Sequence, residues 1–353
     1  MKTLKLLLVI ALYFSAIKVE GQTLPNVAIK DPVYYKNLQV FYLTSNDKLV
    51  DKEYLSLSEA IEKKYVTVYE TGSVQELSIK NNSEKYVYIN SGDIVKGGQQ
   101  DRTIRFDLII PPKSGKIPLY SFCVESGRWQ QRGNEESKEF SENTKVLSSR
   151  KLKIAAKYKQ DQSSVWSGVA EQQEKLNDKA SELKGGNVEV RSDNSASSLQ
   201  LTLENKDINE LIVLYKTKLN KVPSNAIGFA YAINGEVYSI DIYNNIHLFK
   251  SYLDKLLESA IVEAISEYSD EKLFEAKKSD VQVLITSDQF KLESKNEVNS
   301  ITIFETYKTD KALKFITRDK TINSEWIHMN YIQFDEAEIS DKSVNQINQQ
   351  RQR

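Results

Sequence analysis

Two short segments of the chain hold the residue types that could carry out chemistry. The first, residues 92–102, reads Gly-Asp-Ile-Val-Lys-Gly-Gly-Gln-Gln-Asp-Arg, and the second, residues 123–129, reads Cys-Val-Glu-Ser-Gly-Arg-Trp. A Gly-Gly turn lets the backbone approach a ligand or another strand closely, and glutamine and arginine side chains donate hydrogen bonds to carboxylates or phosphates. The two segments are therefore candidates for binding a small anionic ligand, provided that the fold brings them together.

The candidate ligand-binding residues are Gly97, Gly98, Gln100, Arg102, Glu125, Arg128 and Trp129. The same cluster could instead form a hydrolase site, in which Glu125 or Asp93 acts as general acid or base and the arginines stabilise developing negative charge. A structural interpretation also fits, because the glycines could serve a bulge and Arg102 could pair with Glu125 or Asp93 across two strands. In that case Arg128 would pack along Trp129. The residues leave these alternatives open.

The single cysteine and the two histidines carry weaker signals. Cys123 lies between Phe122 and Val124 in a strand-like segment. A lone cysteine there is typical of a small core residue, since a catalytic thiol needs a base or a positive charge beside it. His247 and His328 have no companion at metal-ligand spacing, so we expect no metal site. The sequence contains no Walker loop, Rossmann fingerprint or Gly-x-Ser-x-Gly elbow, and we expect no cofactor.

Together the two segments resemble the motifs of a little-characterised bacterial family, the ARG and rhodanese-phosphatase-superfamily-associated protein domain. In the family pattern an acidic residue precedes a Gly-Gly-x-Gln-Asn-Arg turn, and a Cys-x-Glu-x-Gly-Arg-Trp strand end follows a proline-containing loop. The matching positions are Asp93, Gly97, Gly98, Gln100, Arg102, Cys123, Glu125, Arg128 and Trp129. The resemblance continues through Trp166, residues 226–243 and His328, and it covers nearly all of the chain after its N-terminal segment.

What the resemblance implies about function is limited. The family's name records a genomic association with ADP-ribosylglycohydrolases and phosphatase-like proteins, which implies a link to ADP-ribose or nucleotide metabolism without defining an activity. One position departs from the pattern, since Asp101 stands where the family has Asn. An added negative charge would weaken the binding of an anion, so we leave Asp101 out of the predicted site.

The elements that must position these residues are mainly strands. Segments rich in Val, Ile, Tyr and Phe alternate with turns of Asn, Ser, Gly or charged residues, as is typical of antiparallel strands. The expected strands are 38–44, 65–70, 74–80, 85–90, 103–110 and 117–125. One short helix is expected at 56–64, where Leu57, Ala60 and Ile61 share a face, although we expect no full capping box at Ser56.

The second half of the chain predicts helices and further strands. Polar amphipathic helices are expected between 135 and 184, and the loop 185–198 has no periodicity and is the expected point of mobility. Asp207, with Glu210 three residues later, predicts the start of another helix. Asn234-Gly235 predicts a type I′ hairpin over 227–243, and a long helix with a wide apolar face follows over 248–265. More strands are expected at 281–287, 299–307, 312–317 and 326–334.

The expected fold class is therefore α+β. A β-rich N-terminal half of antiparallel strands is joined to amphipathic helices and to a C-terminal α/β half with a β-hairpin and a long helix. Residues 34–335 should form one family-like domain, with a β-rich part at 34–134 and a helical and α/β part at 135–335. Residues 336–353 read as a polar tail.

The N-terminus has the order of a secretory signal peptide. Lys2 and Lys5 precede an apolar run from Leu6 to Ile17, and Gly21 offers a small residue before the expected cleavage point. We therefore expect residues 1–21 to be removed and the protein to work in the periplasm or outside the cell. No cysteine near the cleavage region could carry a lipid, and no later stretch is long and apolar enough to span a membrane.

Charge and composition exclude some classes of function. The chain has 48 Lys and Arg against 49 Asp and Glu; without the three lysines and one glutamate of the expected signal peptide the net charge is −3. That balance argues against a partner that is a nucleic acid.

The sequence favours an exported binding domain for a small anionic ligand of the nucleotide or ADP-ribose class. A hydrolase acting on such a ligand and a structural or interaction module of the cell envelope are the alternatives.

Overall fold

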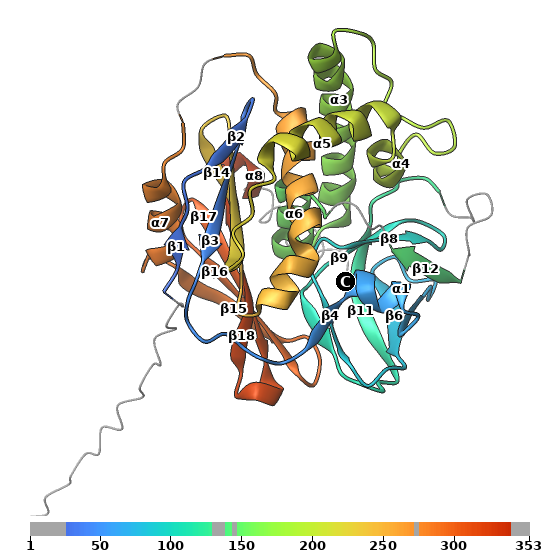
Figure 1. Ribbon diagram of the computed structural model, residues 1–353. Coiled ribbons are helices and arrows are strands. Elements are labelled where there is room, and N and C mark those ends of the chain that lie inside the picture. Colours follow the sequence, from blue (N-terminus) through green and yellow to red (C-terminus); the bar gives the residue numbers. More distant parts are fainter. Residues whose placement is uncertain (1–25, 129–137, 143–146, 272–274, 340–353) are drawn as a thin grey trace, which may run out of the picture.

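We analysed a computed structural model of the protein, which describes residues 26–128, 138–142, 147–271 and 275–339. The expected signal peptide, Trp129 and nearly all of the expected polar tail lie outside the described residues. A broad sheet and a small barrel lie on either side of a layer of helices (Figure 1). The architecture is α+β, as the sequence predicts.

The broad sheet has nine strands and takes them from both ends of the chain. Its order is β1-β3-β13-β14-β18-β17-β16-β15, with β2 also paired to β3. The strands are β1 (Ala28–Ile29), β2 (Val33–Tyr35), β3 (Leu38–Thr44), β13 (Ala226–Ile233), β14 (Glu236–Tyr243), β15 (Lys291–Glu297), β16 (Thr302–Lys308), β17 (Ala312–Asp319) and β18 (Glu325–Gln333). All seven residues of β3 are buried, because its alternating side chains enter two different apolar clusters, one on each face of the sheet.

The barrel closes in the order β11-β6-β5-β12-β8-β9, and a three-stranded sheet β10-β7-β4 lies beside it. The strands are β4 (Tyr54–Ser56), β5 (Val66–Tyr69), β6 (Glu76–Asn81), β7 (Tyr86–Ile89), β8 (Ile94–Gly97), β9 (Arg102–Ile104), β10 (Leu108–Ile110), β11 (Lys116–Cys123) and β12 (Glu139–Glu142). The expectation of a single strand at 103–110 is thus wrong. These residues belong to two strands, because β9 pairs inside the barrel and β10 pairs with β7 in the neighbouring sheet.

The helices fill the space between the two β-structures and cover the far face of the broad sheet. They are α1 (Leu57–Glu62), α2 (Arg150–Lys153), the π-helical segment η1 (Ile154–Lys159), α3 (Gln162–Lys184), α4 (Leu199–Leu203), α5 (Lys206–Leu219), α6 (Ile246–Ser266), α7 (Lys278–Thr286), the 3-10 turn η2 (Lys320–Ile322) and α8 (Glu336–Ile339). Helix α6 lies between the sheet and the barrel, and α7 lies at the opposite face of the sheet (Figure 1).

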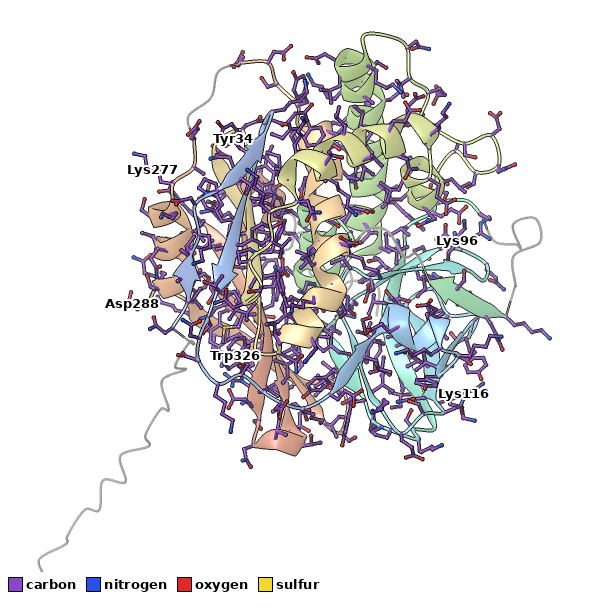
Figure 2. The ribbon with its side chains drawn as sticks, viewed as in Figure 1. Tyr34, Lys96, Lys116, Lys277, Asp288 and Trp326 are labelled. Carbon is purple, nitrogen blue, oxygen red and sulfur yellow. The ribbon has the colours of Figure 1, made fainter. Side chains whose placement is uncertain are left out.

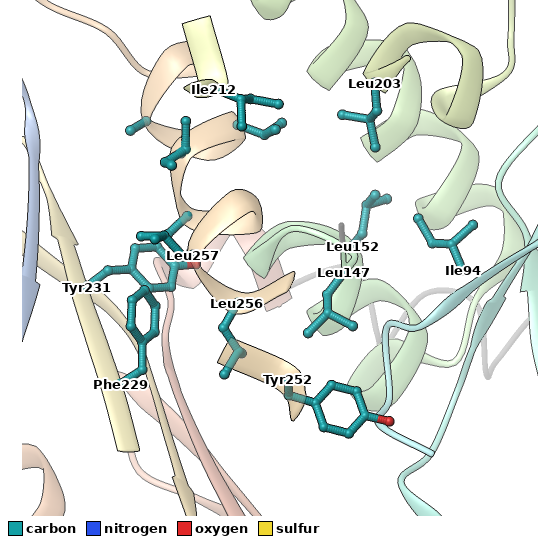
Figure 3. Packing of buried hydrophobic residues seen from close by; sticks show 14 of the residues in the cluster. Ile94, Leu147, Leu152, Leu203, Ile212, Phe229, Tyr231, Tyr252, Leu256 and Leu257 are labelled. Atoms are coloured by element: carbon teal, nitrogen blue, oxygen red, sulfur yellow. The ribbon is translucent and has the colours of Figure 1, made fainter. Parts of the chain in front are cut away.

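One apolar cluster joins the barrel, the helices and the sheet. Tyr252, Leu256 and Leu257 of α6 pack between Phe229 of the sheet and Ile94 of the barrel (Figure 3). Burial of these side chains is the main force that holds the two β-structures together, since each large apolar side chain contributes about 1.5–3 kcal/mol when it leaves water. Charged side chains such as Lys116, Lys277 and Asp288 lie on the outside (Figure 2).

The segment expected as a strand at 281–287 is instead helix α7, so that expectation is wrong. Its apolar residues Val281, Leu284 and Ile285 are spaced to share one helical face, and that face packs on the broad sheet. A short apolar run fits either periodicity, and the neighbouring sheet selects the helix here.

Two helix starts also differ from the expectation. Ser56 does form a full capping box, because its hydroxyl accepts a hydrogen bond from the Glu59 backbone while the Glu59 carboxylate accepts one from the Ser56 backbone. The cap of α5 is Asn205 rather than Asp207, since the Asn205 side chain accepts from the backbone N–H of Asp207 and Ile208.

Within the described residues, the helices are all too short or too polar to cross a membrane.

Candidate functional site

The two motifs meet in the barrel, as the sequence predicts. Strand β9 pairs with β11 in a register that sets Arg102 opposite Cys123. Beyond the end of this pairing, the Gln100 side chain donates from Nε2 to the backbone oxygen of Glu125 at 2.9 Å. The residues after β8 and after β11 therefore form one continuous group.

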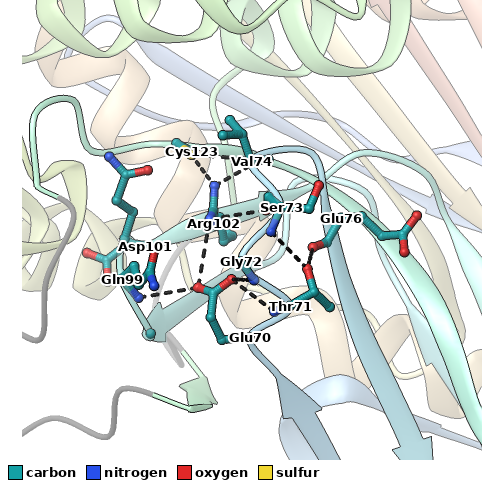
Figure 4. Close-up of polar contacts among 12 residues, drawn as sticks. Glu70, Thr71, Gly72, Ser73, Val74, Glu76, Gln99, Asp101, Arg102 and Cys123 are labelled. Atoms are coloured by element: carbon teal, nitrogen blue, oxygen red, sulfur yellow. Dashed lines mark hydrogen bonds and ion pairs between the residues drawn. The ribbon is translucent and has the colours of Figure 1, made fainter.

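Arg102 is buried, with 1% of its side chain exposed. Its guanidinium donates to the backbone oxygens of Val74 and Ser73 and to the sulfur of Cys123, and it lies 3.7 Å from a Glu70 carboxylate oxygen (Figure 4). The expectation that Arg102 pairs with Glu125 or Asp93 is wrong, because the carboxylate that pairs with Arg102 is that of Glu70, directly after β5. The contacts of Arg102 join three chain segments, as a structural residue would.

Cys123 lies in the same buried group and has no exposed surface. Burial raises the pKa of the Cys123 thiol to about 11, although the charge of Arg102 opposes the shift. A thiol with a raised pKa is protonated at neutral pH and is a poor nucleophile. The geometry supports the structural interpretation of Cys123.

Arg128, Glu125 and Asp101 form the second half of the site. Arg128 donates from Nε to a Glu125 carboxylate oxygen at 2.7 Å, and its terminal nitrogen Nη2 lies 3.6 Å from Asp101. Both carboxylates are buried, and the Arg128 side chain is 9% exposed. Asp101, which we left out of the predicted site because of its charge, is thus one of the groups that Arg128 contacts. Gln100, Asp101, Glu125 and Arg128 are called the motif cluster below.

The two glycines shape the turn beside this cluster. Gly97 and Gly98 have φ angles of 123° and 53°, in the region that favours glycine. A Cβ on Gly98 would lie 2.3 Å from the Phe140 ring, which belongs to the neighbouring strand β12. Gly98 is therefore required for close packing between strands, which is the structural function anticipated as an alternative to ligand contact.

Gln100 has one satisfied and one unsatisfied end. Its Nε2 donates to Glu125, but its buried Oε1 has no hydrogen-bond partner within the described part of the chain. An unpaired buried acceptor costs about 1–3 kcal/mol. The motif cluster thus contains an acceptor that an incoming donor could satisfy.

Asp93 does not join the motif cluster. Its carboxylate accepts hydrogen bonds from Lys255 and Tyr252 of α6, at 2.9 and 3.0 Å, and from the Asn90 backbone. These contacts lie where the barrel meets α6, so the structure does not bring Asp93 and Glu125 together as a catalytic pair. Trp129 lies outside the described residues.

A serine-rich loop, residues 185–198, covers the motif cluster. Ser195 donates to the Glu125 carboxylate at 2.6 Å, Ser198 donates to the Asp101 carboxylate at 3.1 Å, and Ser197 donates to the backbone oxygen of Ser126. The segment contains neither helix nor strand, as expected. We call it the serine loop; its hydroxyl groups supply contacts that the sequence did not predict.

Two cavities lie elsewhere on the molecule. One of about 520 Å³ is lined by residues of η1 and α3, among them Lys159 and Ser163, and one of about 320 Å³ is lined by Tyr34, Tyr268 and their neighbours. Residues of the two motifs do not line either of them. Among the described residues, no group of three or more His, Cys, Asp or Glu side chains is placed to hold a metal ion.

Comparison with known proteins identifies the family. The chain matches the ARG and Rhodanese-Phosphatase-superfamily-associated Protein domain over residues 26–332. The chain belongs to this family. The match spans the broad sheet, the helices and the barrel, so this ARG and rhodanese-phosphatase-superfamily-associated domain is the whole described fold and not the two motifs alone. Searches of the curated proteins and of the solved structures found no match.

Sequence reasoning missed three participants in the site. Glu70 gives no signal of its own, because it is a single acid at the end of a predicted strand. Ser195 and Ser198 lie in a segment whose composition predicts only a loop. Their positions against Glu125 and Asp101 depend on how the helices pack, and no local pattern encodes that.

Proposed function

We propose that this chain is an exported binding domain for a small anionic ligand of the nucleotide or ADP-ribose class, and that the motif cluster is its site. The observation that carries the proposal is the serine loop lying over the cluster. Near the cluster the loop is held by hydroxyl hydrogen bonds to Glu125, Asp101 and Ser126. The two bonds to carboxylates contribute about 1.5–3 kcal/mol each and the bond to the Ser126 backbone about 0.5–1.5 kcal/mol, so a ligand must form comparable charge-assisted contacts to displace this part of the loop.

Displacement of the serine loop from the motif cluster would expose groups that can bind a ligand. Glu125 would lose its contact with Ser195, and a phosphate or carboxylate would then compete with Glu125 and Asp101 for the Arg128 guanidinium. A hydroxyl or amino group of the same ligand would donate to the unpaired Gln100 Oε1. Ribose phosphates carry both kinds of group, which favours this class of ligand.

A thermal-shift screen of the purified protein against ADP-ribose, nucleotides and sugar phosphates tests the proposal. Specific binding raises the melting temperature in a saturable way, because the ligand binds the folded state only. Replacing Arg128 with Gln should weaken the affinity for the ligand found by about 10- to 100-fold, since a charge-assisted contact contributes roughly 1.5–3 kcal/mol. Replacing Arg318 of β17, which pairs with Glu305 outside the motif cluster and the serine loop, with Gln is the matched control and should leave affinity unchanged.

A second variant separates the loop from the ligand contacts. Replacing Ser195 with Ala removes a hydrogen bond that closes the loop over Glu125, so ligand association should become faster while the protein stays folded. A screen in which the folded protein binds none of these compounds would contradict the proposal.

A structural or interaction module of the cell envelope is the second candidate. The observation that favours it is the burial of Arg102 among groups of the chain itself. If the Arg128 variant loses several kcal/mol of stability and no compound binds, Arg128 is bridging buried carboxylates and the motif holds the strands together. The hydrolase alternative, in which Glu125 or Asp93 is the general acid or base, is narrowed to Glu125, because Lys255 and Tyr252 hold Asp93 outside the motif cluster.

A further inference from the structure

A second buried polar group lies where the barrel half meets the broad sheet. Asp107, between β9 and β10, extends its carboxylate to the sheet, where it accepts from Thr317 of β17 at 2.8 Å and lies 2.8 Å from Nδ1 of His328 of β18. On its own side it accepts from the Ser91 backbone and from the Tyr88 hydroxyl. This carboxylate therefore fastens the two β-structures to each other.

The geometry around His328 favours one protonation state of its ring. Nδ1 lies 2.8 Å from Asp107 and Nε2 lies 3.0 Å from Asp241 of β14, and all three side chains are at most 2% exposed. A neutral imidazole has one N–H and would point the lone pair of its other nitrogen at a carboxylate. Only the doubly protonated imidazolium donates to both.

The groups that surround His328 are consistent with a charged ring. Lys157 of η1 lies 3.8 Å from Asp107 and donates to Asn330, and Lys153 of α2 interacts electrostatically with Asp241. The ring of Tyr243 stacks on the imidazole, with centroids 4.2 Å apart, and Tyr88 meets it edge-on. The charged and titratable groups that face His328 are thus two carboxylates, two lysines and two tyrosines.

We propose that His328 is a proton-operated latch between the barrel half and the broad sheet. With the imidazolium in place, Asp107 and Asp241 are drawn together across the junction. Loss of one proton leaves a ring nitrogen facing a buried carboxylate without a hydrogen, and the junction loosens. The latch adds a pH response to the fold, whatever ligand the motif cluster binds.

The direction of the pH response follows from the linkage. Burial alone would lower the pKa of His328, but the charges of Asp107 and Asp241 and the hydrogen bonds to them outweigh burial and raise this pKa above 6.5. Stability contributed by the latch is therefore complete below pH 6.5 and is lost as the pH rises through the pKa of folded His328. Burial opposes the charged form of Asp107 as well, yet Lys157 and His328 keep its pKa well below the usual range, so its charge is lost only in strong acid.

NMR of the two histidine rings tests the protonation state. His328 and the exposed His247 are the only histidines in the chain, so His247 provides an internal reference. We expect the His328 ring to show both N–H protons at pH 6.5 and to lose one only at higher pH. A single N–H at pH 6.5 or below would overturn the proposal.

Amide hydrogen exchange distinguishes a latch from a residue that only adds stability. After correction for the intrinsic pH dependence, exchange in β7, β10 and β18 should accelerate above the His328 transition, while that in β1 and β3 should not. A His328→Gln variant should remove this step, and His247→Gln should keep it. If His328→Gln does not fold, the wild-type exchange profile still decides, because acceleration spread evenly over the molecule would contradict a local latch.

Discussion

Arg102 and Arg128, one from each motif, have different surroundings. Arg102 contacts a carboxylate, two backbone oxygens and a sulfur, deep between three segments of the barrel. Arg128 lies at the rim, where its neighbours are two carboxylates and the serine loop covers them. Both arginines therefore pair with carboxylates of the chain, and Arg128 is the more exposed of the two.

Replacing Arg102 with Ala should lower the free energy of unfolding by about 3–5 kcal/mol, because it leaves the buried Glu70 carboxylate without its cation. Urea denaturation measures this change. Adding Glu70→Gln to the variant should restore part of the loss, and Arg191→Ala should change stability by less than about 0.5 kcal/mol. A loss below about 1 kcal/mol for Arg102→Ala would return this residue to the list of ligand contacts.

At the scale of elements, the turn between β8 and β9 depends on close approach of another strand. The Phe140 ring of β12 lies where a side chain on Gly98 would lie. Strand β12 pairs between β5 and β8 in the barrel, and its Phe140 ring occupies the space that Gly98 leaves.

A Gly98→Ala substitution should therefore destabilise the protein beyond the cost of its backbone angle. Gly72 has a similar positive φ of 77°, and nothing lies within 4 Å of a Cβ placed there, so Gly72→Ala is the matched control. Thermal or urea unfolding should show a loss about 1–3 kcal/mol larger for Gly98→Ala, the usual cost of overpacking. Equal losses for the two variants would mean that Phe140 moves aside freely.

Elements with a strong local pattern could be predicted from the sequence. The Asn234-Gly235 turn and the strand Leu38–Thr44 were both predicted correctly, because turn chemistry and β-propensity act within a few residues. Helix α7 was not, since Val281, Leu284 and Ile285 suit either periodicity until the sheet beneath them is known. The exposed, charged edge strand β15 has no apolar pattern at all.

The site could be predicted as a meeting of two motifs but not as a set of pairs. Strand pairing was enough to bring residues 100–102 beside residues 123–125. The carboxylates beside the two arginines include Glu70 and Asp101. Glu70 gives no signal in the sequence, and Asp101 was left out of the predicted site because of its charge. Asp93 was named beside Glu125 as an alternative general acid or base of the same cluster, whereas its carboxylate contacts Lys255 of α6.

At the scale of the whole molecule, Asp93 forms part of the junction between the barrel and the helical layer. Its ion pair with Lys255 is 2.9 Å long, and both side chains are at most 4% exposed. Together with the apolar cluster around Tyr252 and Leu256, this ion pair holds the barrel against α6.

A double-mutant cycle with Asp93→Asn and Lys255→Met should reveal this coupling. Each single change leaves a buried charged partner without its counter-ion and should lower the free energy of unfolding by about 3–5 kcal/mol. The double variant should lose less than the sum of the two single losses, with an interaction energy of about 1–3 kcal/mol. Urea unfolding of the four proteins measures it. Strictly additive losses would show that the pair does not stabilise the junction, and would reopen a chemical role for Asp93.

The sheet order has a consequence for how the chain is made. Strand β3 lies between β1 and β13, so its inner edge stays unpaired until residue 233 has been synthesised, long after the barrel segments. Bringing such distant partners together carries an entropic cost and slows folding. Throughout that interval a strand with apolar side chains on both faces is open to other chains, so the nascent protein passes through an aggregation-prone stage that ends only when β13 has been synthesised.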